Sequence, residues 1–315
     1  MKPLFLAVIF AVATPVPAQT YTAVEGWAKF ADGKPVGSTH GQIEVDQAGQ
    51  IYVSSDGPRG LMIFDAEGNY LRSLDKKWGG VHGMVMHPEP DGEYLYLAHL
   101  RGKQVVKIDL EGNQIWSIGW PKESGLYDNK AQYKPTDVAI GPDGRIYVAD
   151  GYGMSVIHIY DAGRNYLKTI GGKGKEPGQF ITCHGVEIDN RYFPPRLLVS
   201  DRENNRLQHF TLDGDFMGIV ATGLERPCSV SIHEGLVAVA ELNGRVTVLN
   251  KDNEVHAHLG QNPDPKLRGV NGVLPELWKT GVFTAPHGVG FDAMGNLFVQ
   301  DWNKTGRITK LAVSN

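Results

Sequence analysis

The sequence predicts an all-β fold, a six-bladed β-propeller of four-stranded antiparallel blades. A short apolar strand recurs six times along the chain, each time with a distinctive residue at its key position. These residues are His40, His82, Thr136, His184, Cys228 and His287. Repeats of this kind form solenoids or propellers, and the number of copies gives the number of blades. The 39 glycines and 18 prolines are dispersed at turns rather than gathered in a linker.

The third repeat contains the predicted blade most clearly. Strands are expected at 136–140, 145–150, 156–161 and 166–170, and turn residues such as those at 141–144 separate them. Turn signals about every ten residues between alternating apolar segments are typical of a propeller blade. The other repeats follow the same order of strand and turn.

The two ends of the chain complete the prediction. The last repeat supplies three strands, so its outer edge would stay open to aggregation unless another segment covers it. Residues 21–27 form the remaining strand-like stretch, and we expect them to close the ring by pairing there. Residues 1–18 have the charged start, apolar core and small terminal residues of a cleaved signal peptide. We therefore expect a single propeller over 19–315 in a secreted or periplasmic protein.

Composition excludes several classes of function. The net charge of −4 and pI of about 6.3 come without a basic patch, which argues against nucleic acid as a partner. No later apolar run reaches the length of about 18 residues that a membrane span needs. We expect a monomer that does not cross a membrane and that takes a small molecule or peptide as its substrate.

Histidines at the key position predict a metal site. The first strand of each blade lines the central channel, so equivalent positions form a ring around its axis. His82, His184 and His287 belong to alternate blades and should point at one shared point. Three imidazoles with one side left open are the composition of a catalytic zinc site, although imidazole also suits other divalent metals. His40 lies at the same level and could be a further ligand, a hydrogen-bond donor to one of the ligands or a substrate contact.

Polar residues gather on the rim beside these histidines. Arg59, Arg101, Tyr152 and Arg202 follow second strands, which run back toward the histidine end of the channel. Tyr152 could instead be a packed aromatic, and Arg202 could simply pair with Glu203. Together, a phenol and guanidiniums around a metal would suit an anionic, oxygen-bearing substrate.

A family resemblance sharpens this hypothesis. The strand and turn pattern resembles the NHL-repeat propellers over the whole of 19–315. Residues 135–210 and a motif near the end also resemble the peptidyl-α-hydroxyglycine α-amidating lyases. The motifs that carry this resemblance are Ala149-Asp150-Gly151-Tyr152, Pro177-Gly178-Gln179-Phe180, Asp201-Arg202-Glu203-Asn204 and Pro286-His287-Gly288.

That resemblance implies a set of site residues. The implied ligands of an axial zinc are His82, His184 and His287. Tyr152 takes the place of the catalytic tyrosine, and Arg202 that of an arginine that holds the substrate. Arg59 is the candidate for a second such arginine, with Arg101 as its competitor.

Three positions depart from the family pattern. Gly288 stands where the family has an Asp that binds a structural calcium, which argues against calcium here. Ala285 replaces a Met of the pocket wall, and Gly153 replaces a disulfide cysteine. The two cysteines of this chain, Cys183 and Cys228, either form a disulfide of their own, or Cys228 is a thiol close to the metal.

The resemblance implies a zinc-dependent lyase that cleaves the C–N bond of a peptidyl-α-hydroxyglycine to an amide and glyoxylate. The alternative is a secreted propeller without catalytic activity that binds a peptide, glycan or protein on its rim. A lactonase-type hydrolase is less favoured, because such sites use acidic and amide ligands for calcium. Metal bound by three histidines would separate the lyase from the binding module.

Overall fold

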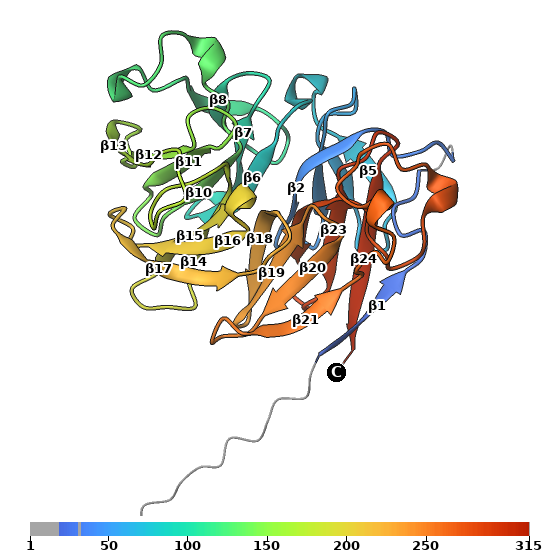
Figure 1. Ribbon diagram of the computed structural model, residues 1–315. Helices are drawn as coiled ribbons and strands as arrows, with labels where there is room; N and C mark the ends of the chain where they lie inside the picture. Colours follow the sequence, from blue (N-terminus) through green and yellow to red (C-terminus); the bar gives the residue numbers. More distant parts are fainter. Residues whose placement is uncertain (1–18, 31–32, 315) are drawn as a thin grey trace, which may run out of the picture.

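The computed structural model describes residues 19–30 and 33–314. Their strands form six four-stranded antiparallel sheets arranged around a central channel (Figure 1). The predicted six-bladed propeller is therefore confirmed. The expected signal peptide, residues 1–18, lies outside the described residues.

Each blade runs outward from the channel in chain order. The first three blades are β2 (Thr39–Val45), β3 (Ile51–Ser55), β4 (Met62–Phe64), β5 (Tyr70–Ser73); β6 (Gly83–Glu89), β7 (Gly92–His99), β8 (Gln104–Ile108), β9 (Gln114–Ile118); and β10 (Asp137–Ile140), β11 (Ile146–Asp150), β12 (Val156–Tyr160), β13 (Tyr166–Gly171). The next two are β14 (Cys183–Asp189), β15 (Arg196–Asp201), β16 (Arg206–Phe210), β17 (Phe216–Thr222); and β18 (Pro227–His233), β19 (Leu236–Glu241), β20 (Arg245–Leu249), β21 (Val255–Leu259). The sixth consists of β22 (Pro286–Phe291), β23 (Leu297–Asp301), β24 (Arg307–Ser314) and β1 (Thr20–Val24).

Apolar side chains fill the spaces between neighbouring blades. Blades three and four share a cluster that includes Ile157, Phe180 and Phe210, all nearly inaccessible to solvent. Comparable clusters join the other neighbouring pairs, including the sixth blade to the first through Trp27 and Phe298. Burying one large apolar side chain contributes about 1.5–3 kcal/mol, so this packing holds the blades around the channel.

Acidic residues at strand ends position the strands that carry the key residues. Asp301 ends β23, and its Oδ1 accepts hydrogen bonds from the backbone N–H groups of Thr284 (2.9 Å) and Ala285 (2.6 Å). Asp201 and Asp150 accept equivalent bonds from the backbone N–H groups of Ile181 and Lys134, in the segments that lead into the first strands of their own blades. Through these bonds the three carboxylates fix the segments that precede His287, His184 and Thr136.

The N-terminal strand closes the ring. β1 pairs with β24 along five residues, from Thr20 opposite Ser314 to Val24 opposite Lys310. The segment predicted to close the ring does so, although its strand begins at Thr20 and ends at Val24. Tyr21 and Ala23 pack against the cluster between the fifth and sixth blades.

Removal of residues 19–24 is expected to lower the free energy of unfolding by several kcal/mol. The deletion removes five paired residues, and each ladder hydrogen bond contributes about 1 kcal/mol. It also leaves β24 as an open edge. Urea unfolding of the two proteins measures the difference, and equal midpoints would contradict closure by β1.

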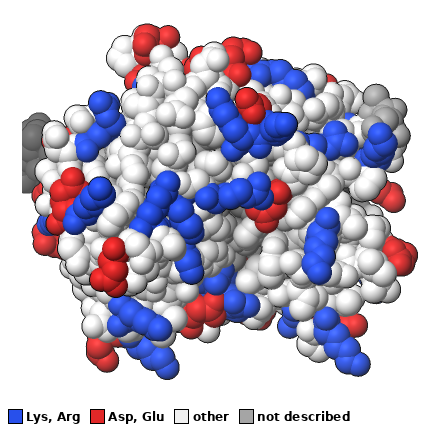
Figure 2. Space-filling view, turned by 90° about the horizontal axis from the view of Figure 1, so that it is seen from above, with Lys and Arg blue, Asp and Glu red and all other residues white. Residues whose placement is uncertain are grey.

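The remaining regular elements are short. Six 3₁₀ helices lie in the loops that the structure describes: η1 (Lys76–Trp78), η2 (Lys122–Ser124), η3 (Lys130–Gln132), η4 (Arg202–Asn204), η5 (Pro265–Leu267) and η6 (Pro275–Leu277). Among the described residues, no helix has the length and apolarity needed to span a bilayer. Seen from above, the molecule is hollowed near its centre, and Lys and Arg side chains border the hollow (Figure 2).

Candidate active site

Three histidines from alternate blades meet inside the channel. His82 directly precedes β6, His184 lies in β14 and His287 lies in β22. Their ring centroids are 4.6 to 4.9 Å apart, and each side chain is at most 3% exposed. The structure therefore brings together the three imidazoles that the repeat pattern predicts to converge.

The His-Gly pair in each of these strands explains how the imidazoles are oriented. Nδ1 of His82 bonds to the carbonyl of Thr136 (2.7 Å), and Nδ1 of His184 to that of Cys228 (3.1 Å). Nδ1 of His287 bonds to the carbonyl of Gly41 at 2.9 Å. Each acceptor belongs to the next blade. The following glycine lets that carbonyl approach, because a Cβ at this position would overlap it.

Gly288 illustrates this constraint. A Cβ there would lie 2.6 Å from the Gly41 carbonyl oxygen, which is the acceptor of the His287 bond. An Asp at position 288 would push the first and sixth blades apart. The departure from the family pattern at this residue thus has a packing reason.

Hydrogen bonding fixes the protonation of the three rings. A carbonyl oxygen can only accept, so each Nδ1 that bonds to one carries the proton and each Nε2 keeps its lone pair, the arrangement found in metal-binding histidines. For His287 the bond to the Gly41 carbonyl (2.9 Å) is shorter than the contact between the Gly41 N–H and the same Nδ1 (3.3 Å). Burial lowers the pKa of His82 to about 3 and lowers those of His184 and His287 well below the usual value. All three are therefore neutral at pH 7. Nε2 of His287 has no hydrogen-bond partner within the described residues.

The donor atoms fall into two overlapping groups. Ligand atoms of His40, His82 and His287 lie within 4.8 Å of one another, as do those of His184, Cys228 and His287. His287 belongs to both. Neutral imidazoles and a thiol are the donors that zinc and related metals prefer, so the cluster fits a divalent metal.

His40 stands beside the three buried rings. Its ring centroid is 4.8 Å from that of His82 and 4.5 Å from that of His287. Its Nδ1 bonds to Oδ2 of Asp56 at 2.9 Å. His40 therefore lies next to the three buried histidines, while its Nδ1 is hydrogen-bonded to Asp56 on the rim.

Tyr152 lies directly over the histidines. Its Oη is 2.9 Å from Nε2 of His184 and 3.2 Å from Nε2 of His82. Arg202 donates a hydrogen bond from Nη1 to the same Oη at 3.1 Å. Burial raises the pKa of Tyr152, while the Arg202 guanidinium acts in the opposite direction. The phenol can thus donate to an imidazole while it accepts from a cation.

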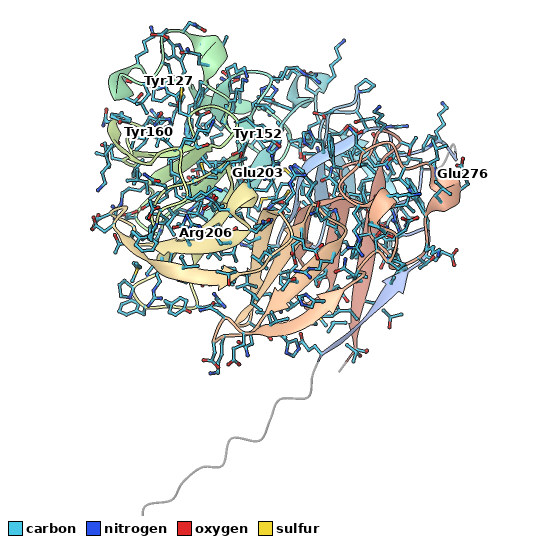
Figure 3. The ribbon with its side chains drawn as sticks, viewed as in Figure 1. Tyr127, Tyr152, Tyr160, Glu203, Arg206 and Glu276 are labelled. Atoms are coloured by element: carbon cyan, nitrogen blue, oxygen red, sulfur yellow. The ribbon has the colours of Figure 1, made fainter. Side chains whose placement is uncertain are left out.

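A cavity of about 430 Å³ opens above this group. Its lining includes His40, Tyr152, Arg202, Arg226, Leu242, Gly269, His287 and Trp302. Arg202 and Arg226 both pair with Glu203, at 2.9 and 2.7 Å. Figure 3 labels Tyr152 and Glu203, the two partners of Arg202. The cavity thus joins two imidazoles of the histidine cluster, those of His40 and His287, to a phenol and two guanidiniums.

The two weaker sequence candidates lie elsewhere on the rim. The Arg59 guanidinium stacks on Phe30, 4.2 Å from the ring centroid. Arg101 donates to the carbonyl of Asp56 at 3.0 Å. Neither side chain lines the cavity. The second arginine that lines the cavity is Arg226, which was not among the candidates from the sequence.

The disulfide alternative is wrong: Cys183 and Cys228 are both buried free thiols. Cys183 packs in the cluster between the third and fourth blades. Cys228 packs instead with Leu242 and Ala285. Separate packing environments keep the two sulfurs from pairing, and the expected alternative, a Cys228 thiol beside the histidines, agrees with the geometry.

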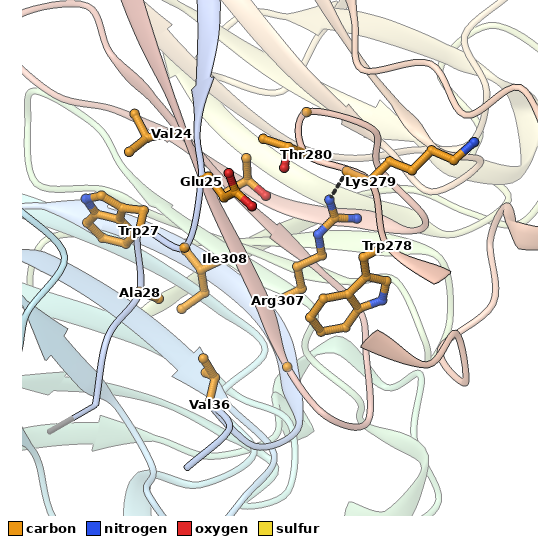
Figure 4. A pocket seen from close by; sticks show the side chains of 14 residues that line it. Val24, Glu25, Trp27, Ala28, Val36, Trp278, Lys279, Thr280, Arg307 and Ile308 are labelled. Atoms are coloured by element: carbon orange, nitrogen blue, oxygen red, sulfur yellow. Dashed lines mark hydrogen bonds between the residues drawn. The ribbon is translucent and has the colours of Figure 1, made fainter. Parts of the chain in front are cut away.

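A different cavity, of about 280 Å³, lies where β1 meets the sixth blade (Figure 4). Arg307 is its most conspicuous side chain, but its guanidinium already donates to the carbonyls of Val282 and Lys279 and stacks on Trp278. No histidine or cysteine occurs among the described residues that line it. It therefore lacks the convergent reactive groups of the axial cavity.

The buried histidines predict a loss of stability below pH 6.5 in metal-free protein. The unfolded chain protonates its histidines near pH 6.5, whereas the folded protein keeps His82 neutral down to about pH 3. Because the unfolded chain binds more protons, the free energy of unfolding falls as the pH falls, by roughly 1.4 kcal/mol per pH unit for each imidazole. Urea unfolding at pH 7 and pH 5 measures this slope. A His82→Gln variant should have a smaller slope, and equal slopes would contradict the assignment.

Comparison with known families agrees with the architecture. Residues 133–160 match the NHL repeat family, and they contain β10, β11 and β12 of the third blade. The third blade matches the NHL repeat, and the chain folds as a six-bladed propeller. The other blades have the same strand order.

Two curated proteins are similar to parts of this propeller. A probable peptidyl-α-hydroxyglycine α-amidating lyase of Caenorhabditis elegans is 34% identical over 135 residues, which cover 41% of this chain and 36% of that protein. The NHL repeat-containing protein 3 of Mus musculus is 26% identical over 181 residues, covering 54% of this chain and 51% of that protein. The chain thus matches between about a third and a half of the length of these relatives.

Solved structures resemble the whole propeller. Virginiamycin B lyase from Staphylococcus aureus has a TM-score of 0.59 at 12% identity, covering 93% of this chain and 98% of that one. A gluconolactonase from Xanthomonas campestris has a TM-score of 0.64 at 11% identity, covering 96% and 99%. At these identities the likeness establishes the fold alone.

Proposed function

We propose that this propeller is a metal-dependent carbon–nitrogen lyase that cleaves a peptidyl-α-hydroxyglycine-like carbinolamide to an amide and glyoxylate. One observation carries the proposal: the Oη of Tyr152 lies against Nε2 of both His82 and His184, and Tyr152 lines one cavity together with Arg202 and His287. Partial identity to a probable amidating lyase agrees with it. The enzyme would act as a secreted or periplasmic protein on a small or peptide substrate with a carboxylate.

The metal would be held by His82, His184 and His287, with zinc as the favoured ion. Three imidazoles leave a coordination position open, as catalytic sites require. A divalent metal bound there supplies Lewis acidity, which lowers the pKa of a hydroxyl group in its coordination sphere. Cys228 lies close enough to be an additional donor.

Tyr152 would handle the proton. In the proposed reaction the C–N bond breaks, the carbon–oxygen bond of the carbinol becomes a carbonyl, and the hydroxyl proton ends on the departing nitrogen. Oη of Tyr152 lies beside two of the Nε2 atoms, so it can take this proton and deliver it to nitrogen. Tyr152 would take the proton as a phenolate, which the hydrogen bond from Arg202 stabilises, and it would return to the phenolate when the proton passes to nitrogen.

Arginines would hold the substrate carboxylate. No carboxylate side chain is among the described residues that line the cavity, whereas Arg202 and Arg226 both are. A guanidinium binds a carboxylate through paired hydrogen bonds, which fixes the orientation of the substrate. The reacting carbon would then lie between this anchor and the imidazoles.

Incubation of zinc-loaded protein with N-benzoyl-α-hydroxyglycine tests the proposal. We expect equal amounts of benzamide and glyoxylate, formed well above the rate of the protein-free solution and measured by chromatography. Zinc-loaded protein that binds metal but releases neither product would contradict the lyase. A rim-binding propeller without catalytic activity would then be the better account.

A further inference from the structure

The lining of the cavity above the histidines combines cationic and apolar side chains. Arg202 and Arg226 come from the fourth and fifth blades, and Leu242 and Trp302 contribute apolar surface from the fifth and sixth. A volume of about 430 Å³ is within the range of small-molecule sites. A ligand that fills it must therefore combine an anionic group with an apolar group.

Arg226 is held in place by an acidic partner. Its Nη2 and Nε donate to the two oxygens of Glu203, at 2.7 and 3.1 Å. Arg202 donates to the same carboxylate from Nε at 2.9 Å. One carboxylate thus orients two guanidiniums and leaves the pair with a net positive charge. Nη1 of Arg226 has no hydrogen-bond partner in the part of the chain that the structure describes, so its protons are free for a ligand.

Trp302 provides an aromatic part of the lining. Its ring lies 5.7 Å from that of His40, and it packs against the cluster of Cys228, Leu242 and Ala285. Trp302 is partly exposed while Leu242 is buried. An aromatic face backed by a buried apolar cluster offers a favourable surface for an apolar group.

We propose that Arg226 anchors the carboxylate of the ligand and that Trp302 and Leu242 receive an apolar acyl group. The cavity would thus select N-acylglycines whose acyl part is aromatic or aliphatic. This inference rests on the proposed function for the bond that reacts. The residues that line the cavity support the recognition of both ends of the ligand.

Binding of N-benzoylglycine, which lacks the hydroxyl and cannot be cleaved, tests the carboxylate anchor by calorimetry. Arg226→Gln should weaken binding about 10- to 100-fold, as expected for a hydrogen bond between charged groups. Arg72→Gln is the matched control, because Arg72 is equally exposed and also pairs with a glutamate, Glu111. An Arg226→Gln protein that binds like wild type would overturn the anchor.

The role of Trp302 and Leu242 is tested by comparing the affinities for N-benzoylglycine and N-acetylglycine. Wild type should bind the benzoyl compound at least about tenfold more tightly, because it buries more apolar area. Trp302→Ala should lose this preference, and Trp302→Phe should keep most of it. Near-ultraviolet circular dichroism checks that each variant is folded. An unchanged preference in a folded Trp302→Ala protein would overturn this half of the inference.

The two proposals fail differently. If the wild-type protein binds N-benzoylglycine through Arg226 but does not cleave N-benzoyl-α-hydroxyglycine, the proposed lyase activity is wrong and the proposed ligand recognition is retained. If cleavage occurs with the same KM in Arg226→Gln, the lyase stands and the anchor is wrong.

Discussion

Replacement of Tyr152 by Phe is expected to lower kcat for carbinolamide cleavage by about 10²- to 10⁴-fold, the usual contribution of a positioned acid–base group. The change removes one oxygen, which lies 2.9 Å from Nε2 of His184 and accepts a hydrogen bond from Arg202. The phenyl ring keeps the packing of the tyrosine. Metal content should stay at the wild-type level, because the imidazoles are unaltered.

Tyr160 offers a matched control for this experiment. Its side chain is buried, and its Oη has no hydrogen-bond partner within the described residues. Tyr160→Phe removes the same atom from a site that does not use it, so kcat should be unchanged. Steady-state kinetics and elemental analysis of both variants give the comparison. Equal kcat values for Tyr152→Phe and wild type would remove Tyr152 from the mechanism.

Replacement of His287 by Ala is expected to abolish stoichiometric metal binding. His287 belongs to both groups of donor atoms in the channel, and its buried Nε2 has no hydrogen-bond partner among the residues that the structure describes. Loss of this donor leaves two imidazoles of the proposed set, so we expect affinity for zinc to fall at least about 100-fold. That is more than the 10- to 100-fold typical of residues that merely orient ligands.

Elemental mass spectrometry of proteins purified without chelator measures this loss. His256→Ala is the control, since His256 lies in β21, the outer strand of the fifth blade. Circular dichroism checks that the His287→Ala protein is folded, because the change also leaves the Gly41 carbonyl unpaired. A folded His287→Ala protein with wild-type zinc content would contradict the axial site.

The repeat pattern was sufficient to predict the fold and the central histidines. Six copies of one strand imply six blades, and a fixed phase within each copy implies a common position on the channel. His82, His184 and His287 converge because they occupy the same position in alternate blades around one axis. Closure by β1 was predictable for a similar reason, since the sixth blade would otherwise lack its outer strand.

Loop residues were harder to place from sequence. Arg59 and Arg226 both lie in loops between strands, and the path of such loops depends on local packing. The guanidinium of Arg59 stacks on Phe30. A signal for Arg226 existed nonetheless. It lies two residues before Cys228, the same phase as Ala285 before His287, a position already assigned to the pocket wall. The corresponding phase of the fifth repeat therefore indicates a pocket residue at Arg226.

Anomalous diffraction from crystals of the zinc-loaded protein tests the central claim most directly. Data collected on either side of the zinc absorption edge locate the ion independently of any activity. We predict a single strong peak on the channel axis within bonding distance of Nε2 of His82, His184 and His287. A fully loaded crystal with no peak at this position, or with a peak that excludes His82, would contradict the proposed metal centre.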